Sequence, residues 1–300
     1  YEITCRDWSS DGCSSDLTRQ GWYDEKYRKR DRHAEELFIL TQVLKHRKIH
    51  KRMGAIKLRL LINKLLTDHD IKIGRDRFYE LLRNHQLLIK LQRRRTRTTD
   101  SDHPYIKYPN IAKELVLEKS GQLWVSDITY LRLRNRFAYL SLVTDAYSRK
   151  VVGWALWPTL NSQGPLTALQ MAIHHQQACH ALIHHSDRGI QYCCNDYVHE
   201  LQQNGIKISM TERGDPYENA LAERMNETFK VEYELEQIFD SFNQAKQETQ
   251  LAIEAYNSLR PHLSLGLLTP DQAHQMQGSQ RRMWKKDRHK KRNHSSVMQS

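Results

Sequence analysis

The sequence of 300 residues has no long apolar run and contains little cysteine. Its longest apolar stretches fall far short of the roughly 20 residues that cross a bilayer, which excludes a membrane-spanning protein. Two of its five cysteines lie near the start, and the others, Cys179, Cys193 and Cys194, form neither a CxxC pair nor an even framework. This excludes a small disulfide scaffold and favours a reducing, cytosolic compartment.

Negative charge is also in short supply, since 35 Asp and Glu stand against 47 Lys and Arg. The excess of +12 suggests a polyanionic partner, most often nucleic acid. Residues 17–100 hold 23 basic and 10 acidic residues and residues 281–300 hold 8 and 1, whereas residues 101–280 hold 15 and 20. We interpret this as DNA-binding flanks around an acidic centre, although charge alone leaves a solvated surface as an equal alternative.

The first 17 residues differ from the rest of the chain. They are rich in Ser and Asp, lack an initiator Met and show neither helical nor strand periodicity. No basic start leads into an apolar run, as it would in a secretory signal. We therefore expect residues 1–17 to be a leader foreign to the protein, and we leave them out of the fold prediction.

A helical domain is predicted over residues 24–92. Apolar residues at helical spacing predict one helix over residues 24–48 and a second over residues 52–66. A turn-like break at residues 68–74 precedes a third, basic helix. This order is the outline of a helix-turn-helix, whose second helix enters the DNA major groove. The apolar stripe of the first helix is expected to comprise Ala34, Leu37, Phe38, Thr41 and Leu44.

DNA contacts are expected on the third helix and just beyond it. Arg75 and Arg77 point outward there, opposite an apolar face. A basic linker is predicted over residues 93–115, where Ser, Thr, Asp and Pro prevent regular structure. We expect its arginines to follow DNA phosphates, with a solvated hinge as the alternative. The linker begins with Arg93, Arg94 and Arg95.

Beyond residue 121 the pattern changes to that of a mixed α/β domain, which we predict over residues 116–275, ahead of a basic tail over residues 276–300. Runs rich in β-branched and aromatic residues favour strands, and the short turns between them indicate an antiparallel meander. The three strands are predicted over residues 123–131, 138–145 and 151–157.

Helices and strands then alternate. A long helix is predicted from Asp215, an N-cap residue followed by Pro216, whose missing N–H costs nothing in a first turn. The fold class is therefore α/β, a mixed sheet with flanking helices preceded by an all-α helix-turn-helix domain. Between the meander and the long helix we predict a helix over 162–178, a strand over 181–185, a helix over 192–203 and a strand over 206–210.

Three acidic residues occupy informative positions in this domain. Asp127 lies in mid-strand, where an unpaired carboxylate is expensive to desolvate. Asp187 ends a buried strand, and Glu223 lies two turns into the long helix. Converging carboxylates suit Mg²⁺ or Mn²⁺, and two such ions about 3.5–4 Å apart can clamp the attacking and leaving oxygens of a phosphodiester. Lys230, seven residues after Glu223, shares its helix face and could contact DNA phosphate there.

The spacing of these acids identifies a family resemblance. There are 59 residues between Asp127 and Asp187 and 35 between Asp187 and Glu223, which resembles the D,D-35-E signature of retroviral integrases and bacterial insertion-sequence transposases. The motifs around these residues are similar to those of OrfB, the catalytic subunit of two-frame insertion-sequence transposases. They are WVSDITY, HSDRGIQY and DPYENALAERMNETFK, with AYNSLRPHLSLGLLTP near the C-terminus. The resemblance covers roughly residues 25–275.

The resemblance implies an RNase H-like sheet on which Asp127, Asp187 and Glu223 are the catalytic metal ligands and Lys230 contacts DNA. It implies a transposase that frees a 3′-OH at a terminal inverted repeat and uses it to attack a second phosphodiester, with no covalent protein–DNA intermediate. The implied cofactors are two Mg²⁺ ions, for which Mn²⁺ could substitute. The implied partners are double-stranded repeat and target DNA, an upstream OrfA-type subunit or fusion, and further copies of the chain at the bacterial nucleoid.

Two other functions remain as alternatives, an RNase H-like nuclease and a non-catalytic DNA-binding regulator. Among other residues, Glu218 is interpreted as a helix cap and Asp145 as a turn residue. Glu227 lies one turn past Glu223, at a spacing that does not match the signature. Tyr192 is interpreted as a core residue, with stacking on an unpaired base as its alternative. His46 and His50 have metal-ligand spacing, but no paired cysteines follow, so no zinc site is expected.

Overall fold

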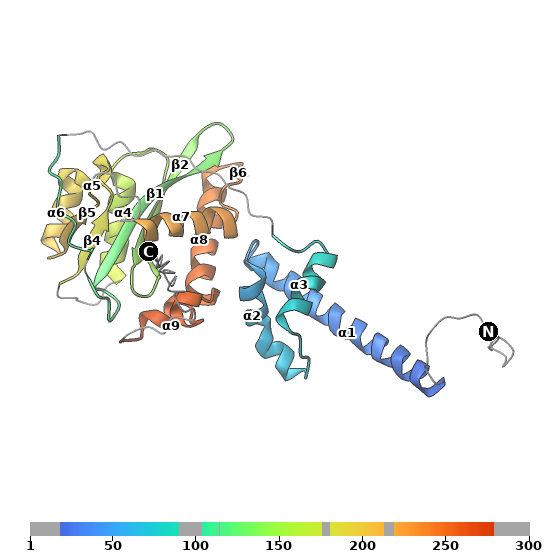
Figure 1. Cartoon of the computed structure of the whole chain (residues 1–300). Coiled ribbons are helices and arrows are strands. Elements are labelled where there is room, and N and C mark those ends of the chain that lie inside the picture. The colour runs from blue at the N-terminus through green and yellow to red at the C-terminus, as the bar shows by residue number, and fades with distance from the viewer. Residues whose placement is uncertain (1–18, 90–103, 114, 176–180, 213–218, 279–300) are drawn as a thin grey trace, which may run out of the picture.

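The computed structural model describes residues 19–89, 104–113, 115–175, 181–212 and 219–278 (Figure 1). The predicted leader and most of the predicted basic tail lie outside the described residues, as do Arg93, Arg94 and Arg95. None of the helices in the described ranges combines the length and the apolar character needed to cross a membrane.

Three helices form the N-terminal part of the structure, as predicted. They are α1 (Arg19–Ile49), α2 (Ala55–Asp68) and α3 (Arg75–Asn84). They enclose one hydrophobic core, to which α3 contributes Phe78 and Leu82, both inaccessible to solvent. The N-terminal half of α1 extends away from this core (Figure 1).

The apolar stripe expected on α1 is wrong except at Phe38, which packs against the core. Leu37 and Leu44 are 51% and 52% exposed, and the buried face instead presents Ile39, Leu40 and Val43. Both rows have helical spacing, so the sequence pattern alone does not decide which of them meets a partner. Contact with α2 and α3 makes that choice, because it covers only one side of the helix.

The C-terminal part is built on one mixed sheet with the strand order β3-β2-β1-β4-β5. The predicted antiparallel meander is confirmed, since β2 pairs with both β1 and β3, whereas β1, β4 and β5 are parallel. A sixth strand, β6, pairs with the far end of β1. The strands are β1 (Leu123–Leu133), β2 (Phe137–Asp145), β3 (Val151–Trp157), β4 (Ile183–Ser186), β5 (Lys207–Met210) and β6 (Ile238–Phe239).

Helices cover both faces of this sheet. Alternate residues of a strand point to opposite faces, so Leu142 and its neighbour Val143 belong to different hydrophobic clusters. The Val143 cluster includes α4 (Gln163–His175), α5 (Ile190–Cys193) and α6 (Asn195–Gln203). The Leu142 cluster includes α7 (Ala220–Glu232) and α8 (Phe242–Leu259), which is followed by a 3-10 turn (Leu263–Leu265) and α9 (Pro270–His274).

Two predicted helices differ from the structure. The helix expected over residues 192–203 is two helices, because Cys194 takes an extended conformation with φ −66° and ψ 151° between α5 and α6. The long helix expected from Asp215 begins only at Ala220, and Glu223 consequently lies in its first turn. Asp215, Pro216 and Glu218 fall outside the described residues.

Candidate active site

The site is built around a stretch of β1 that lies open at one edge. On that side, β4 pairs with residues 123–125 and β6 with residues 132 and 133. Residues 126–131 between them pair with no further strand in the described part of the chain. Asp127 lies in this open stretch, in mid-strand as predicted.

Asp187 directly follows the last residue of β4, at the strand-to-loop edge where it was predicted. Because β4 runs parallel to β1 and pairs with residues just before Asp127, the two carboxyl groups approach each other at the same edge. Asp187 and Asp127 line one cavity of about 350 Å³. The backbone N–H of Gly189 donates to Asp187 Oδ1 at 3.0 Å and fixes this carboxylate in its loop.

Asp127 is held by two hydrogen bonds and carries a perturbed pKa. The backbone N–H of Ile128 donates to its Oδ1 at 2.9 Å, and Nδ2 of Asn226 on α7 donates to its Oδ2 at 2.8 Å. Burial, together with the charges of Asp187 and Glu223, raises the pKa of Asp127 to about 7, although the two hydrogen bonds act to lower it. The carboxyl group therefore lies among like charges in a poorly solvated place.

Glu223 lies on α7, beside this cavity and exposed to solvent. Its helix is fixed to β1 by Asn226 and by Asn219, whose Nδ2 donates to the carbonyl oxygen of Ser126 at 3.3 Å. Glu223 does not line the cavity. Among the described residues, no three His, Cys, Asp or Glu side chains form a group that could hold a metal ion. The structure thus brings Asp127 and Asp187 together and places Glu223 on the adjoining helix, without closing a three-ligand site.

The chemistry of these residues fits a divalent cation. Mg²⁺ and Mn²⁺ take carboxylate oxygens as ligands, and Asp127 and the two carboxylates that raise its pKa, Asp187 and Glu223, offer only such oxygens. Like charges repel one another, and the charges of Asp187 and Glu223 add to the effect of burial in raising the pKa of Asp127. No histidine or cysteine lines the cavity among the described residues.

Lys230 lies on the same helix as Glu223, as predicted. Its Nζ sits 4.1 Å from the ring centroid of Tyr130, a cation–π contact that holds the ammonium group over β1. Burial lowers the pKa of Lys230, while Tyr130 and Asp127 raise it. Lys230 is therefore close enough to Asp127 for the charge of this carboxylate to affect its pKa.

Two buried histidines of β4, His184 and His185, make polar contacts with neighbouring elements. His184 Nε2 is 2.8 Å from Ser126 Oγ and 2.9 Å from the hydroxyl of Tyr197. His185 Nδ1 is 2.9 Å from Ser209 Oγ. Burial lowers the pKa of His184 to about 3, so its ring is neutral. These contacts give the two histidines structural roles between β1, β4, β5 and α6.

Several residues interpreted as structural from the sequence have that role. Asp145 is fully buried, and its Oδ1 accepts hydrogen bonds from both the backbone N–H and the hydroxyl of Ser148 at 2.7 Å. Tyr192 is a core residue at 2% exposure, but it also lines the cavity, and its hydroxyl has no hydrogen-bond partner among the described residues.

Asn226 is the site residue that sequence reasoning missed. The signal was present, because Asn226 follows Glu223 by three positions and thus shares its helix face. An amide carries no charge, so the search for acids and bases passed over it. Three arginines at alternate positions near the β1–β2 turn, Arg132, Arg134 and Arg136, were likewise not singled out; all three are exposed.

Arg75 and Arg77 lie on the outer face of α3, as predicted. Both are exposed, and each contacts an acid: Arg75 Nε donates to Asp76 Oδ1 at 2.9 Å, and Arg77 Nη2 donates to Glu36 Oε1 at 3.1 Å. Exposed pairs of this kind contribute little free energy. A phosphate could therefore replace the acid at small cost.

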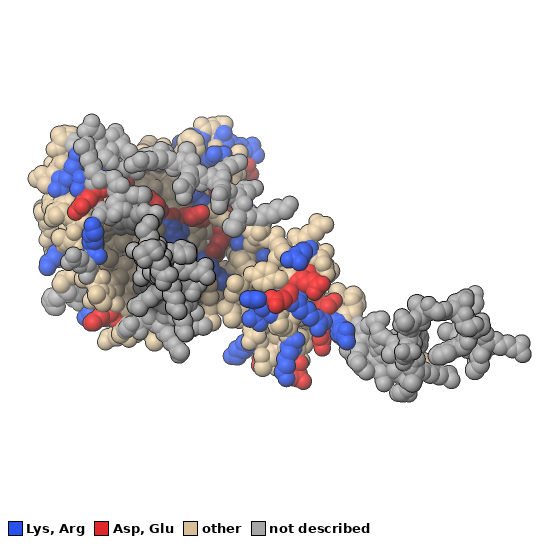
Figure 2. Space-filling model, viewed as in Figure 1, with Lys and Arg blue, Asp and Glu red and all other residues tan. Residues whose placement is uncertain are grey.

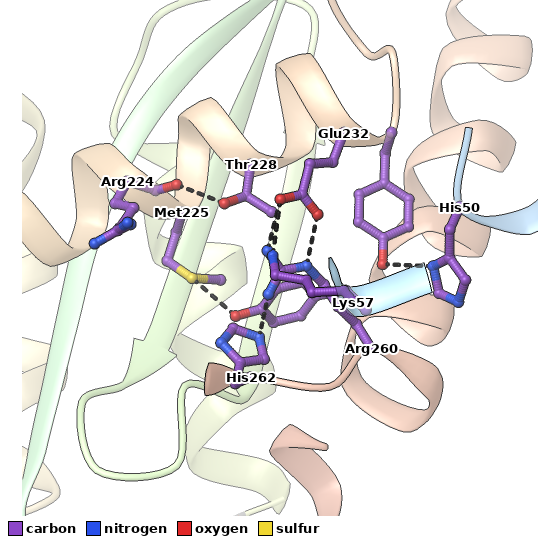
Figure 3. Close-up of polar contacts among 10 residues, drawn as sticks. His50, Lys57, Arg224, Met225, Thr228, Glu232, Arg260 and His262 are labelled. Atoms are coloured by element: carbon purple, nitrogen blue, oxygen red, sulfur yellow. Dashed lines mark hydrogen bonds and ion pairs between the residues drawn. The ribbon is translucent and has the colours of Figure 1, made fainter. Parts of the chain in front are cut away.

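The helical part and the sheet meet at the C-terminal end of α7 (Figure 3). Glu232 accepts two hydrogen bonds from Arg260, both at 2.8 Å, and one from Lys57 of α2 at 3.1 Å. Arg260 also donates to His262 Nε2 at 2.6 Å. The backbone N–H of Arg52 donates to the carbonyl oxygen of Glu232 at 2.9 Å. Thus α7 carries Glu223 in its first turn and contacts the N-terminal helical part at its last residue, Glu232.

Comparisons with known proteins point to one family. Two family models, both described as integrase core domain, match residues 118–216 and 204–270. The insertion element IS600 uncharacterized 31 kDa protein of Shigella sonnei is 31% identical over 268 residues, which cover 87% of this chain and 97% of that protein. Transposase InsF for insertion sequence IS3A of Escherichia coli is 38% identical over 153 residues, covering 51% of this chain and 53% of that protein. The match to InsF thus spans only about half of its length.

Solved structures also show similarity. The simian T-cell lymphotropic virus intasome matches with a TM-score of 0.46 at 17% identity, covering 78% of this chain and 74% of that chain. The HTLV-2 integrase catalytic core domain, solved in complex with magnesium, matches with a TM-score of 0.41 at 18% identity, covering 52% of this chain and 97% of that chain. The fold follows from the strand order of the sheet and from the two matches to the integrase core domain.

Proposed function

The chain belongs to the integrase-core transposases of bacterial insertion sequences, and from this premise we propose that it cuts the 3′ ends of its element's terminal inverted repeats and joins them to a second DNA strand. Both steps are phosphoryl transfers at one site, with water as the first nucleophile and the freed 3′-OH as the second. The observation that supports this most directly is the pairing of Asp127 and Asp187 in one cavity, with Glu223 on the adjoining helix.

In this proposal Asp127, Asp187 and Glu223 hold Mg²⁺, with Mn²⁺ able to substitute. Two such ions, when bound, would activate the nucleophile and stabilise the leaving oxygen. Asn226 keeps the Asp127 carboxylate in one orientation through its hydrogen bond to Oδ2. Lys230, held over Tyr130, supplies a positive charge for a DNA phosphate beside the acids.

DNA binding in this proposal involves the N-terminal helices and the basic segment that follows them in the sequence. Arg75 and Arg77 on α3 would contact double-stranded repeat DNA, and Arg93, Arg94 and Arg95 would follow its phosphates toward the site. An upstream OrfA-type subunit or fusion, and further copies of the chain on DNA, belong to the proposal through the family alone. So does its place at the nucleoid in the bacterial cytoplasm.

The test is Mg²⁺-dependent strand joining on a labelled duplex that carries the element's inverted repeat. Asp127→Asn, Asp187→Asn and Glu223→Gln should each abolish joining, whereas the matched control Glu227→Gln, one turn further along the exposed side of α7, should join as the parent does. Equal joining by the three substituted proteins would refute the catalytic assignment. Cleavage of RNA–DNA hybrids without action on repeat DNA would establish the nuclease instead, and metal-independent binding without any cleavage would establish the regulator.

A further inference from the structure

The cavity that holds Asp127 and Asp187 continues into a part that the carboxylates do not explain. It extends along β1 and β2 to an apolar surface, which we call the aromatic wall and which consists of Tyr130, Phe137, Tyr139 and Leu160. Phe137 and Leu160 are 47% and 48% exposed, although large apolar side chains are usually buried. An exposed apolar surface inside a cavity indicates a ligand with an apolar face.

The strand register arranges this wall. Tyr130 lies directly opposite Tyr139 in the antiparallel pair, so their side chains share one face of the sheet. Phe137 packs edge-on against Tyr130, with their ring centroids 5.3 Å apart and their planes at 78°. Asp127 and Tyr130 point to opposite faces of β1, because they are three positions apart, but both line the cavity at the open edge of this strand. A group that rests on the wall therefore shares this cavity with the carboxylates.

Charged and polar groups surround the wall. Lys230 lies 4.1 Å over the ring of Tyr130. Arg132, Arg134 and Arg136 follow at the end of the hairpin, where Figure 2 shows basic side chains gathered. On the α5 side, Tyr192 lines the cavity, and its buried hydroxyl has no hydrogen-bond partner among the described residues. This is the surrounding expected for a flat apolar group attached to an anionic backbone.

We propose that the aromatic wall holds an unpaired base of the DNA strand, one nucleotide away from the phosphodiester that reacts. The proposal rests on the proposed function, because it assumes that DNA enters the cavity. A volume of about 350 Å³ is small for a ligand cleft and fits one nucleotide better than a duplex. Aromatic side chains stack on any base, and lysine and arginine nearby bind the flanking phosphates. The end of the DNA would therefore be opened before it is cut.

The experiment measures binding in EDTA, so that no strand is cut. The probe is a fluorescent duplex with a short single-stranded thymidine extension, compared with the same duplex carrying abasic residues in the extension. The parent protein should bind the abasic probe roughly 5- to 150-fold more weakly, because stacking on an aromatic side chain contributes on that order per base. Phe137→Ala and Tyr139→Ala should weaken binding of the thymidine probe and remove most of the difference between the probes. Phe137→Trp, which keeps an aromatic ring, should retain the difference between the two probes.

The control is Ile238→Ala on β6, whose side chain is 64% exposed and does not line the cavity. It should discriminate between the probes as the parent does. When a probe with 5-iodouracil in its extension is irradiated with ultraviolet light, the base should cross-link to Tyr130, Phe137 or Tyr139. Equal binding of both probes by the parent, or full discrimination by folded Phe137→Ala and Tyr139→Ala proteins, would overturn the proposal. Since no reaction is measured, a protein that discriminates between the probes but joins no strands would refute the proposed function alone.

Discussion

At the scale of single residues, the amide of Asn226 fixes the carboxylate that is central to the site. Its Nδ2 donates to Asp127 Oδ2 at 2.8 Å from the helix that also carries Glu223. Without this donor, the carboxylate keeps only the hydrogen bond from the backbone N–H of Ile128, so it is held less firmly and its charged form loses a stabilising partner. Asn226 is a positioning residue in this account, since it acts through Asp127.

Asn226→Leu should therefore reduce strand joining by about 10- to 100-fold and raise the Mg²⁺ concentration needed for half-maximal joining. Asn226→Gln, which keeps an amide, should recover part of the activity. The measurement is a Mg²⁺ titration of joining for each protein. If the leucine variant lost activity with an unchanged Mg²⁺ requirement, Asn226 would act on folding or DNA rather than on Asp127.

The buried histidines predict acid sensitivity. Burial lowers the pKa of His50 to about 4 and that of His184 to about 3, below the ordinary 6.5. The unfolded chain therefore binds more protons as the pH falls below about 6.5, and stability is lost toward about pH 4. From about pH 7 to about pH 5.5 each histidine should cost about 1 kcal/mol of unfolding free energy.

Asp127 acts in the opposite direction over the same range. Its pKa of about 7 lies above the ordinary 3.8, so the folded protein takes up a proton first and gains stability as the pH falls. Asp127→Asn removes this gain. As the pH is lowered in EDTA, the unfolding free energy of the variant should therefore fall more steeply than that of the parent. Urea unfolding at several pH values measures both slopes. Identical slopes would mean that the Asp127 carboxyl is not perturbed.

The positions of the key residues along the chain could be predicted from the sequence because each is tied to a local pattern. Asp127 interrupts a run of strand-forming residues, and Asp187 ends a short buried strand. The contact between Asn226 and Asp127 joins residues 99 positions apart. No local pattern encodes such a contact, since it depends on how α7 packs on β1.

At the scale of elements, β3 and α4 approach so closely at Gly153 that no side chain fits. A Cβ atom added there would lie 2.1 Å from the carbonyl oxygen of Ala168 and 2.9 Å from the Cβ of Ala172. Since both neighbours belong to the helix, the strand and the helix would have to separate. This contact holds α4 against the sheet on the face opposite α7.

Gly153→Ala should lower the free energy of unfolding by about 1–3 kcal/mol. The matched control is Gly54→Ala at the start of α2, where nothing lies within 4 Å of the added atom. It should cost less than about 1 kcal/mol, as the helix start is slightly less well capped. Chemical denaturation of the two proteins tests this directly. Equal losses would show that the sheet and α4 adjust freely.

The elements that sequence analysis misplaced share a physical cause. Periodicity shows that a helix exists, but packing decides which row of apolar residues is buried, as it does for Ile39 and Val43 on α1. Cys193 and Cys194 fit a continuous helical pattern, yet the chain turns at Cys194 so that α6 can lie against α4 and β5. Tertiary contacts override local preference in both places.

At the scale of the whole molecule, Lys57 ties the helical part to the sheet. Its Nζ lies 3.1 Å from Glu232 Oε1, with side chains 18% and 21% exposed. Lys57→Met should cost about 1–3 kcal/mol, because the carboxylate loses one charged donor but keeps Arg260. Hydrogen exchange should speed up in α2 and α3 while β1 stays protected.

Lys64→Met is the matched control, since it removes the same charge from an exposed position of the same helix. Its exchange rates should equal those of the parent. Faster exchange throughout the sheet of the Lys57 variant would contradict the local tie and mean that the two parts unfold as one unit.

The cluster around Glu232 also bears on how such proteins can be recombined. A helical part taken from a related protein would meet Glu232 and Arg260 at a fixed place on this sheet. To form the same contacts with Glu232, it would need a cation at the position of Lys57 and a backbone N–H at the position of Arg52. Exchanging the N-terminal helices between relatives therefore requires matching this small contact, in addition to whatever the helices recognise.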